Sequence, residues 1–190
     1  MGAAVRNRRD SGSSSSGSDD ESGPKVYAMR EKMLALIRDD FKINRMKGRR
    51  GRGRPAYIAR EKIARMRDTF ELQSLGGDTL YQIQERKARV RDAMAIEDEN
   101  GHKVAEIKKR KIGLVRDNYK LKIRDERDWE IHGSILEHDY TIREGGSVIA
   151  TIHEKWIAPV QDCYFVDVDE GEDHALVLCV CIALEAMDED

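Results

Sequence analysis

The stretch DNYKL at residues 117–121 is one of six copies of a short pattern that indicates the fold of this chain. In the pattern, an acidic residue is followed two positions later by an aromatic or large apolar residue, and two positions after that by an aliphatic one. The other copies are DDFKI at 39–43, DTFEL at 68–72, DAMAI at 92–96, HDYTI at 138–142, where His138 stands in the acidic position, and DCYFV at 162–166. Their central residues lie 21 to 29 positions apart. A regular period of this length predicts one supersecondary unit that is used repeatedly.

Each unit has the pattern of two strands. The aromatic and aliphatic positions of the motif are two residues apart, so in a strand they project from the same face. Five of the copies are preceded by a stretch that alternates apolar and polar residues. These stretches are YAMREK, AYIAREK, LYQIQER, VAEIKKRK and IATIHEK. Turn-forming residues such as LGGD at 75–78 and Asn100-Gly101 separate strands. Six units therefore predict a mainly β fold of about twelve antiparallel strands.

The end of the chain predicts how such a sheet is filled. A barrel of eight strands is filled by its own side chains. A barrel of twelve strands is wider, so its interior must hold a plug or water, unless the strands form a sandwich instead. The run ALVLCVCIAL at 175–184 is apolar throughout and follows the acidic EGED, which suits a helix amino terminus. A buried strand pair is the alternative, favoured by the β-branched residues. Because no turn residue interrupts the run up to Met187, we predict a buried helix at about 173–187.

Length and composition predict one domain with a separate tail. Residues 1–24 are rich in Ser, Gly and charge, which predicts a disordered tail, and residues 25–190 are predicted to form the barrel domain. The start MGAAVR has the Gly2 of a myristoylation site, but Arg6 stands where Ser or Thr is required. No run approaches the ~20 apolar residues of a membrane span. The three cysteines lie in apolar stretches without metal-ligand spacing, so we expect buried thiols in a reduced cytosol.

These residues resemble the LURP-one-related family. The resemblance is carried by the six strand pairs with their repeated motif, by EKWIAPVQDCYFV at 154–166 and by VDVDEGEDHALVLCVCIAL at 166–184, and it covers residues 26–187. It implies a closed twelve-stranded antiparallel barrel around a central carboxy-terminal helix, related to the tubby carboxy-terminal and phospholipid scramblase barrels. It also implies basic strand faces that hold phosphoinositide headgroups.

Residues 44–55, NRMKGRRGRGRP, form the most unusual segment, and we predict a basic loop inserted in the first hairpin. Six cations here and no acid contrast with nine acids and no Lys or Arg at 167–190. The candidate anion-binding residues are Arg45, Lys47, Arg49, Arg50, Arg52 and Arg54. They could bind anionic lipid, where each cation near the surface contributes ~1 kcal/mol. Alternatively, Arg52 to Pro55 match an AT-hook, in which arginines enter the minor groove of A·T tracts. A solvated flexible loop is the third interpretation.

The sequence contains no arrangement that predicts catalysis. Nucleophile elbows, phosphate-binding loops and dinucleotide motifs do not occur, and the five histidines lack metal spacing. We therefore expect a non-enzymatic, monomeric, cytoplasmic binding module without cofactor or metal, peripheral at the membrane, whose partner is an anionic phospholipid surface. Nucleic-acid binding is the alternative, followed by scramblase-like lipid transport or a plain scaffold role.

Overall fold

The computed structural model describes residues 24–31, 40–47, 53–62, 69–85, 93–110, 117–124, 128–134, 139–154 and 163–188. These residues form twelve strands and one helix. The strands are β1 (Lys25–Glu31), β2 (Asp40–Met46), β3 (Gly53–Glu61), β4 (Thr69–Ser74), β5 (Thr79–Glu85), β6 (Ala93–Asp98), β7 (Lys103–Arg110), β8 (Asp117–Ile123), β9 (Trp129–Ser134), β10 (Asp139–Glu144), β11 (Ser147–Glu154) and β12 (Cys163–Val168), and the helix is α1 (His174–Asp188). The predicted tail lies outside the described residues, except for Pro24.

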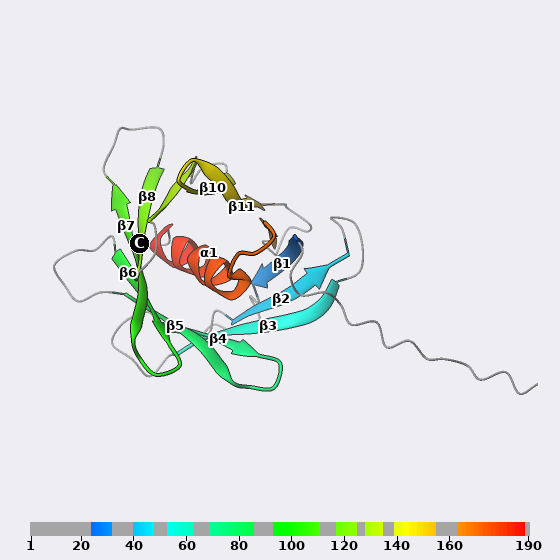
Figure 1. Ribbon diagram of the computed structural model, residues 1–190. Helices are drawn as coiled ribbons and strands as arrows, with labels where there is room; N and C mark the ends of the chain where they lie inside the picture. The colour runs from blue at the N-terminus through cyan, green and yellow to red at the C-terminus, as the bar shows by residue number, and fades with distance from the viewer. Residues whose placement is uncertain are drawn as a thin grey trace, which may run out of the picture.

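The strands form a closed antiparallel barrel (Figure 1). Each strand pairs with the strands before and after it in the chain, and β1 pairs with both β2 and β12. Closure removes the unpaired sheet edges that would otherwise invite association. The predicted mainly β barrel is confirmed.

The repeated motif supplies the inner layers of the barrel. Its six copies lie on the even-numbered strands, and both apolar positions of every copy are buried. These residues are Phe41, Ile43, Phe70, Leu72, Met94, Ile96, Tyr119, Leu121, Tyr140, Ile142, Tyr164 and Val166. The odd-numbered strands contribute inward residues such as Met29, Ile83 and Ile131. One motif is used six times because each strand pair faces the same axis.

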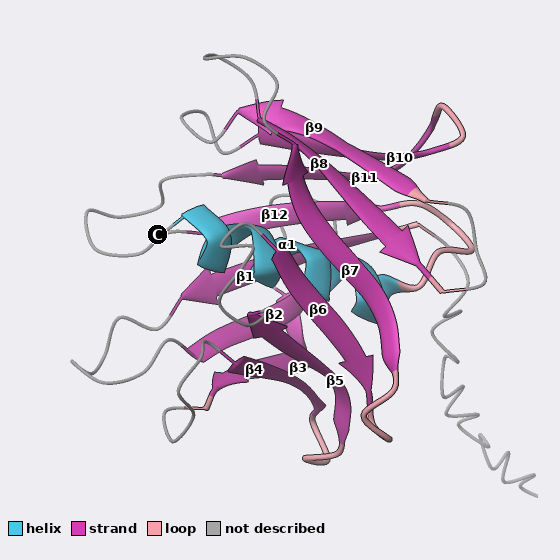
Figure 2. Cartoon of the chain, turned by 90° about the vertical axis from the view of Figure 1, so that its left-hand side faces the viewer, coloured by secondary structure: helices cyan, strands magenta, loops and turns pink. Residues whose placement is uncertain are grey.

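Helix α1 fills the barrel, as predicted from the apolar run. Every residue from Leu176 to Leu184 is buried, which requires protein on all sides of the helix. The helix begins one residue later than predicted and ends at Asp188. Figure 2 shows α1 lying along the interior of the ring of strands. Among the described residues, no helix is long and apolar enough to cross a bilayer.

The two ends of the barrel differ. The tight turns at 75–78, 99–102 and 145–146 lie at the end where α1 begins, which we call the hairpin end. The turn predicted at Asn100-Gly101 is present, and Gly101 has a φ of 78°, which favours glycine. The connection between β2 and β3 is shorter than the predicted basic loop. Residues 44–46 belong to β2 and residues 53–55 to β3, so only 47–52 remain between them.

The three cysteines form no disulfide and are buried, as predicted. Burial raises the pKa of the Cys179 and Cys181 thiols. The Cys181 thiol also donates a hydrogen bond to the Val177 carbonyl at 3.2 Å. The two thiols therefore belong to the buried packing of α1.

Candidate functional site

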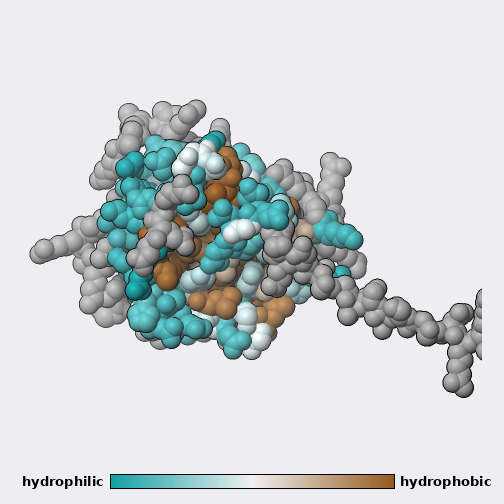
Figure 3. All heavy atoms as spheres, viewed as in Figure 1, coloured by the Kyte–Doolittle hydropathy of each residue, from teal (hydrophilic) through white to brown (hydrophobic). Residues whose placement is uncertain are grey.

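A cavity of about 520 Å³ lies at the hairpin end of the barrel. Strands β1, β2 and β3, the β4–β5 turn and the first residues of α1 line it. Its basic residues are Lys25, Arg45 and Arg54, and the rings of Tyr27 and Tyr57 are part of its wall. We call this cavity the basic cavity. Figure 3 shows hydrophobic side chains in the middle of the view, within a mostly hydrophilic outline.

Strand alternation, together with the register shift between β2 and β3 at Ile43 and Asn44, explains why these cations line the cavity. Lys25 lies on the same face of β1 as Tyr27 and Met29, which are both buried in the core. Tyr27 is the cross-strand partner of Arg45, and Arg45 is the partner of Arg54. The three cations therefore project from neighbouring strands at one rim of the barrel. Lys25 is only 9% exposed, and a buried charge is costly unless other groups compensate it.

Asp173 anchors the start of the helix beside the basic cavity. Its Oδ1 accepts a hydrogen bond from the Leu176 N–H at 2.9 Å, and its carbonyl accepts one from the Val177 N–H at 3.0 Å. This is an N-cap, which satisfies donors that the first turn leaves unpaired. The Tyr81 hydroxyl donates to the other carboxylate oxygen at 2.6 Å. Burial, followed by this bond, raises the pKa of Tyr81, so its hydroxyl stays protonated.

His174, the first residue of α1, is held within the basic cavity. Its ring lies edge-on to Tyr27, with 5.7 Å between centroids. Burial lowers the pKa of His174, the charges of Lys25 and Arg45 lower it further, and Asp173 opposes them. Its Nδ1 is a buried atom with no hydrogen-bond partner. His174 is therefore a neutral imidazole at pH 7, next to fixed cations.

This arrangement is suited to binding an anion. Three cations and two carboxylates, Glu172 and Asp173, line the cavity and leave one net positive charge in a partly enclosed space, where electrostatic interactions are stronger than in bulk water. Among the described residues, no three His, Cys, Asp or Glu side chains are grouped to hold a metal ion.

The structure divides the six predicted site residues. Arg45 and Arg54 are brought together in the basic cavity, while Lys47 is exposed just beyond β2 and is absent from the cavity lining. Arg49, Arg50 and Arg52 lie outside the described residues. Sequence reasoning missed Lys25 and His174. Continuing the alternation of Tyr27 and Met29 back by one step would have placed Lys25 inside the barrel.

The pairing of part of the predicted AT-hook within the barrel argues against the AT-hook interpretation. Gly53, Arg54 and Pro55 are paired in β3 with residues of β2, whereas a hook needs an extended segment that is free to enter a groove. A Cβ on Gly53 would lie 2.6 Å from the Met46 Sδ and 2.7 Å from the Asn44 Cβ. Close packing at the irregularity between Ile43 and Asn44 thus accounts for this glycine.

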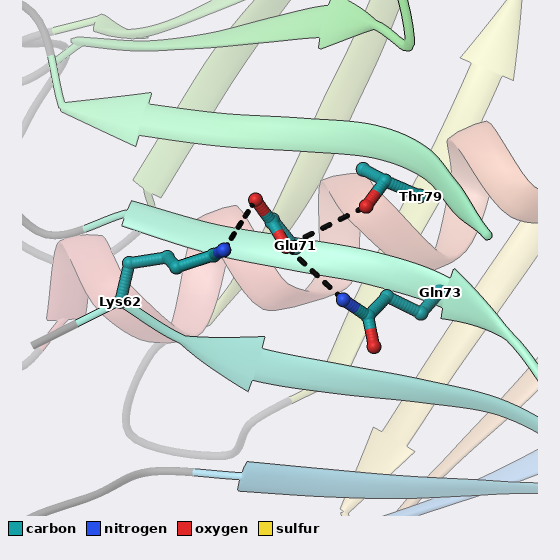
Figure 4. A network of polar contacts seen from close by, with 4 residues as sticks. All are labelled: Lys62, Glu71, Gln73 and Thr79. Carbon is teal, nitrogen blue, oxygen red and sulfur yellow. Dashed lines mark hydrogen bonds and ion pairs between the residues drawn. The ribbon is translucent and has the colours of Figure 1, made fainter. Parts of the chain in front are cut away.

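Several described lysines outside the barrel have acidic partners. The Lys62 ammonium lies 2.8 Å from the Glu71 carboxylate, which also accepts hydrogen bonds from Gln73 at 3.1 Å and Thr79 at 3.5 Å (Figure 4). Lys108 lies 3.4 Å from Glu106. These pairs offset the positive charge that the sequence predicts for the barrel exterior.

Comparisons with known proteins agree with this architecture. A family model described as LURP-one-related matches residues 25–185. A search of curated proteins gives no match. Among solved structures, the chain is similar to the X-ray structure of a protein from Arabidopsis thaliana, with 18% sequence identity and a TM-score of 0.61. The alignment covers 87% of this chain and 92% of that one. At this identity the likeness establishes the fold alone.

Proposed function

Because this chain belongs to the LURP-one-related family and carries a basic cavity at one end of its barrel, we propose that it is a non-enzymatic binding module for anionic phospholipid headgroups at a membrane surface. The observation that carries the proposal is the convergence of Lys25, Arg45 and Arg54 from three adjacent strands. Arg45 and Arg54 come from the segment whose composition predicts contact with anions.

The contact is assigned here to the hairpin end. Outer lysines such as Lys62 are engaged with carboxylates. The cations of the basic cavity line a space that can hold a headgroup. Leu75, at the β4–β5 turn, lines the same cavity and is 57% exposed. An apolar side chain beside cations suits the bilayer interface, where stable binding usually needs two kinds of attraction.

Acidic residues limit how the molecule can approach a membrane. Asp169 and Glu170 are exposed between β12 and α1, also at the hairpin end. Anionic lipid would repel them. We therefore expect the rim formed by β1 to β3 and the β4–β5 turn to approach the membrane, with Asp169 and Glu170 tilted away.

Vesicle sedimentation at physiological salt tests the proposed function. Phosphatidylcholine vesicles are compared with vesicles that also contain phosphatidylserine, and we expect retention on the anionic vesicles only. The double substitution Arg45→Gln and Arg54→Gln should weaken this binding by about tenfold or more, because each cation near anionic lipid contributes ~1 kcal/mol.

The control removes two cations from the opposite face of the same strands. Lys42 and Arg60 are exposed and lie beside the inward-facing Phe41 and Ala59. Lys42→Gln with Arg60→Gln makes the same change in net charge, and we expect it to leave most of the binding intact. Equal losses from both pairs would contradict the assigned site. Equal binding to neutral and anionic vesicles would overturn the proposed function.

A further inference from the structure

We propose that His174 is a ligand-binding residue of the basic cavity, and that its ring takes up a proton from solvent when an anionic headgroup binds. Headgroup binding then tightens as the pH falls. This inference rests on the proposed function, because it describes how pH regulates the same site. The headgroup can belong to a lipid in a membrane or be free in solution, and the experiment below separates these two sources.

His174 lies where a ligand in the cavity would meet it. It is the first residue of α1 and belongs to the cavity lining. The Tyr27 ring lies edge-on to the imidazole. Within the described part of the chain, the His174 Nδ1 is a buried atom that has no hydrogen-bond partner. A buried polar atom without a partner costs free energy, and a ligand that pairs with it recovers that energy.

The surroundings of His174 disfavour a charge on the ring in the free protein. Burial is the largest cause that lowers the pKa of His174, and the charges of Lys25 and Arg45 lower it further, whereas Asp173 opposes them. The other charged or titratable residues described in the lining are Arg54, Glu172, Tyr27 and Tyr57. Histidine is the one side-chain type among all of these whose ordinary pKa lies between about 5 and 8. A proton is therefore expected to enter or leave the cavity at His174.

A bound anion reverses the balance at the ring. Arg45 is close enough to His174 for its charge to lower the pKa of the imidazole. An anionic group that binds Arg45 therefore lies near the ring as well, and an opposite charge within ~4–6 Å favours the charged form of a titratable group. An imidazolium has two N–H donors, so it can donate a hydrogen bond to an oxygen of the ligand. The pKa of His174 is then higher in the bound state than in the free state.

A higher pKa in the bound state makes headgroup binding take up a proton. By linkage, a falling pH then strengthens binding, and this gain is lost as the pH rises through the pKa of the bound state. The pKa of free His174 lies below its ordinary value, so the gain continues to grow below a pH of about 6.5. Because one proton is taken up, affinity changes by at most about tenfold per pH unit.

Vesicle sedimentation with the full chain at two pH values tests the inference. Phosphatidylcholine vesicles that contain phosphatidylglycerol are suitable, because the phosphodiester keeps its single charge between the two values. We expect binding to be at least about fivefold tighter at a pH of about 5.5 than at about 7.5. His174→Gln removes the titratable ring but keeps a polar side chain, and it should reduce this ratio by about threefold or more.

The control removes an imidazole outside the cavity. His132 is exposed on the outer face of β9, where its Nδ1 lies 2.7 Å from the Asn118 Oδ1. His132→Gln should leave the pH ratio of the wild-type chain unchanged. This variant accounts for the general gain of positive charge on the protein surface as the pH falls. An equal loss of the ratio in His174→Gln and His132→Gln would contradict the assignment to His174.

Proton uptake is measured directly on the wild-type chain. Calorimetry in two buffers that differ in ionisation enthalpy compares the same vesicles with glycerophosphoglycerol, which is the headgroup without acyl chains. At a pH of about 6.5 we expect uptake of about 0.2 to one proton in at least one arm. Uptake with vesicles alone identifies a membrane ligand, and uptake with the soluble compound identifies the free headgroup as a competent ligand.

A second measurement decides the test if His174→Gln fails to fold, as judged by its urea transition. The ring resonances of the five histidines are then titrated by NMR in the wild-type chain, with and without the soluble headgroup. We expect one histidine that has a lowered pKa in the free chain to show a higher pKa when the headgroup is present. No such change would overturn the inference.

The outcomes separate this inference from the proposed function. Binding to anionic vesicles with the same pH ratio in the wild-type chain and in His174→Gln would retain the proposed function and overturn the role of His174. Proton uptake with the soluble headgroup, without vesicle binding at either pH, would support that role and overturn the membrane function. The absence of binding in both arms would overturn both proposals.

Discussion

At the scale of single residues, small side chains opposite large rings let the barrel close around its helix. Phe41 has Ala59 as its cross-strand partner, and Tyr140 has Gly133. Large and small residues that face each other in this way fill a core without voids or strain. The sequence motif identifies the rings, but it contains no indication of which residues must remain small opposite them.

Gly133→Ala tests this packing. A Cβ on Gly133 would lie 2.3 Å from the Asp139 carbonyl oxygen and 2.4 Å from the Tyr140 Cδ1. Because backbone must move to relieve this overlap, we expect a loss of about 1–3 kcal/mol in the free energy of unfolding, measured by urea denaturation.

Gly76→Ala, in the β4–β5 turn, is the matched control. The nearest atom to its added Cβ would be the Asp78 Oδ2 at 3.4 Å. We expect no loss, or a gain of up to about 1 kcal/mol from the reduced entropy of the unfolded chain. Equal effects of the two substitutions would contradict the packing explanation for Gly133.

At the scale of elements, α1 is held by a tyrosine at each end. Tyr81 of β5 donates to Asp173 beside the amino terminus of the helix, and Tyr164 of β12 donates to Glu185 near its carboxy terminus at 2.7 Å. The apolar surface of α1 alone does not fix its rotation about the helix axis or its depth in the barrel. These two hydrogen bonds help to fix both. The position of α1 also places His174 in the basic cavity.

Leu178→Ala tests the contribution of the helix to the core. Leu178 is fully buried, and truncating a buried leucine removes transfer energy and leaves a cavity. We expect the free energy of unfolding to fall by about 2–5 kcal/mol. The control is the same substitution at the exposed Leu75, which should change stability by no more than about 0.5 kcal/mol. A small effect at Leu178 would indicate that the helix packs loosely.

At the scale of the whole molecule, barrel and helix share one hydrophobic core, and we expect them to unfold as one cooperative unit. Burying Leu176, Val177, Leu178, Val180, Ile182 and Leu184 contributes about 1.5–3 kcal/mol each. Their sum is comparable with the about 5–15 kcal/mol by which whole domains are stable. A ring of twelve strands without the helix would therefore have an unfilled apolar interior.

Ending the chain after Gly171 removes α1 and tests this dependence. We expect an aggregating product without a cooperative thermal transition, because the inward side chains of the strands lose their main partner. A chain that ends after Asp188, which retains the helix, is the control and should melt cooperatively. A soluble, cooperatively melting product without α1 would contradict the account of the core.

The site was only partly predictable from the sequence. Arg45 and Arg54 were identified because the segment around them is unusually basic. The same composition also led to the prediction of Lys47 as a site residue, but Lys47 is absent from the cavity lining. Lys25 and His174 escaped notice because each stands alone in its local sequence, and neither belongs to a motif.

The sequence by itself determined the repeating strands, the buried faces of those strands and the apolar helix. These features depend on local periodicity, which the order of residues records directly. Only the tertiary structure decided that Lys25, Arg45, Arg54 and His174 line one cavity. Their meeting depends on the pairing of β1 with both β2 and β12, and on the depth of α1 in the barrel. These are contacts between distant parts of the chain, and no local pattern encodes them.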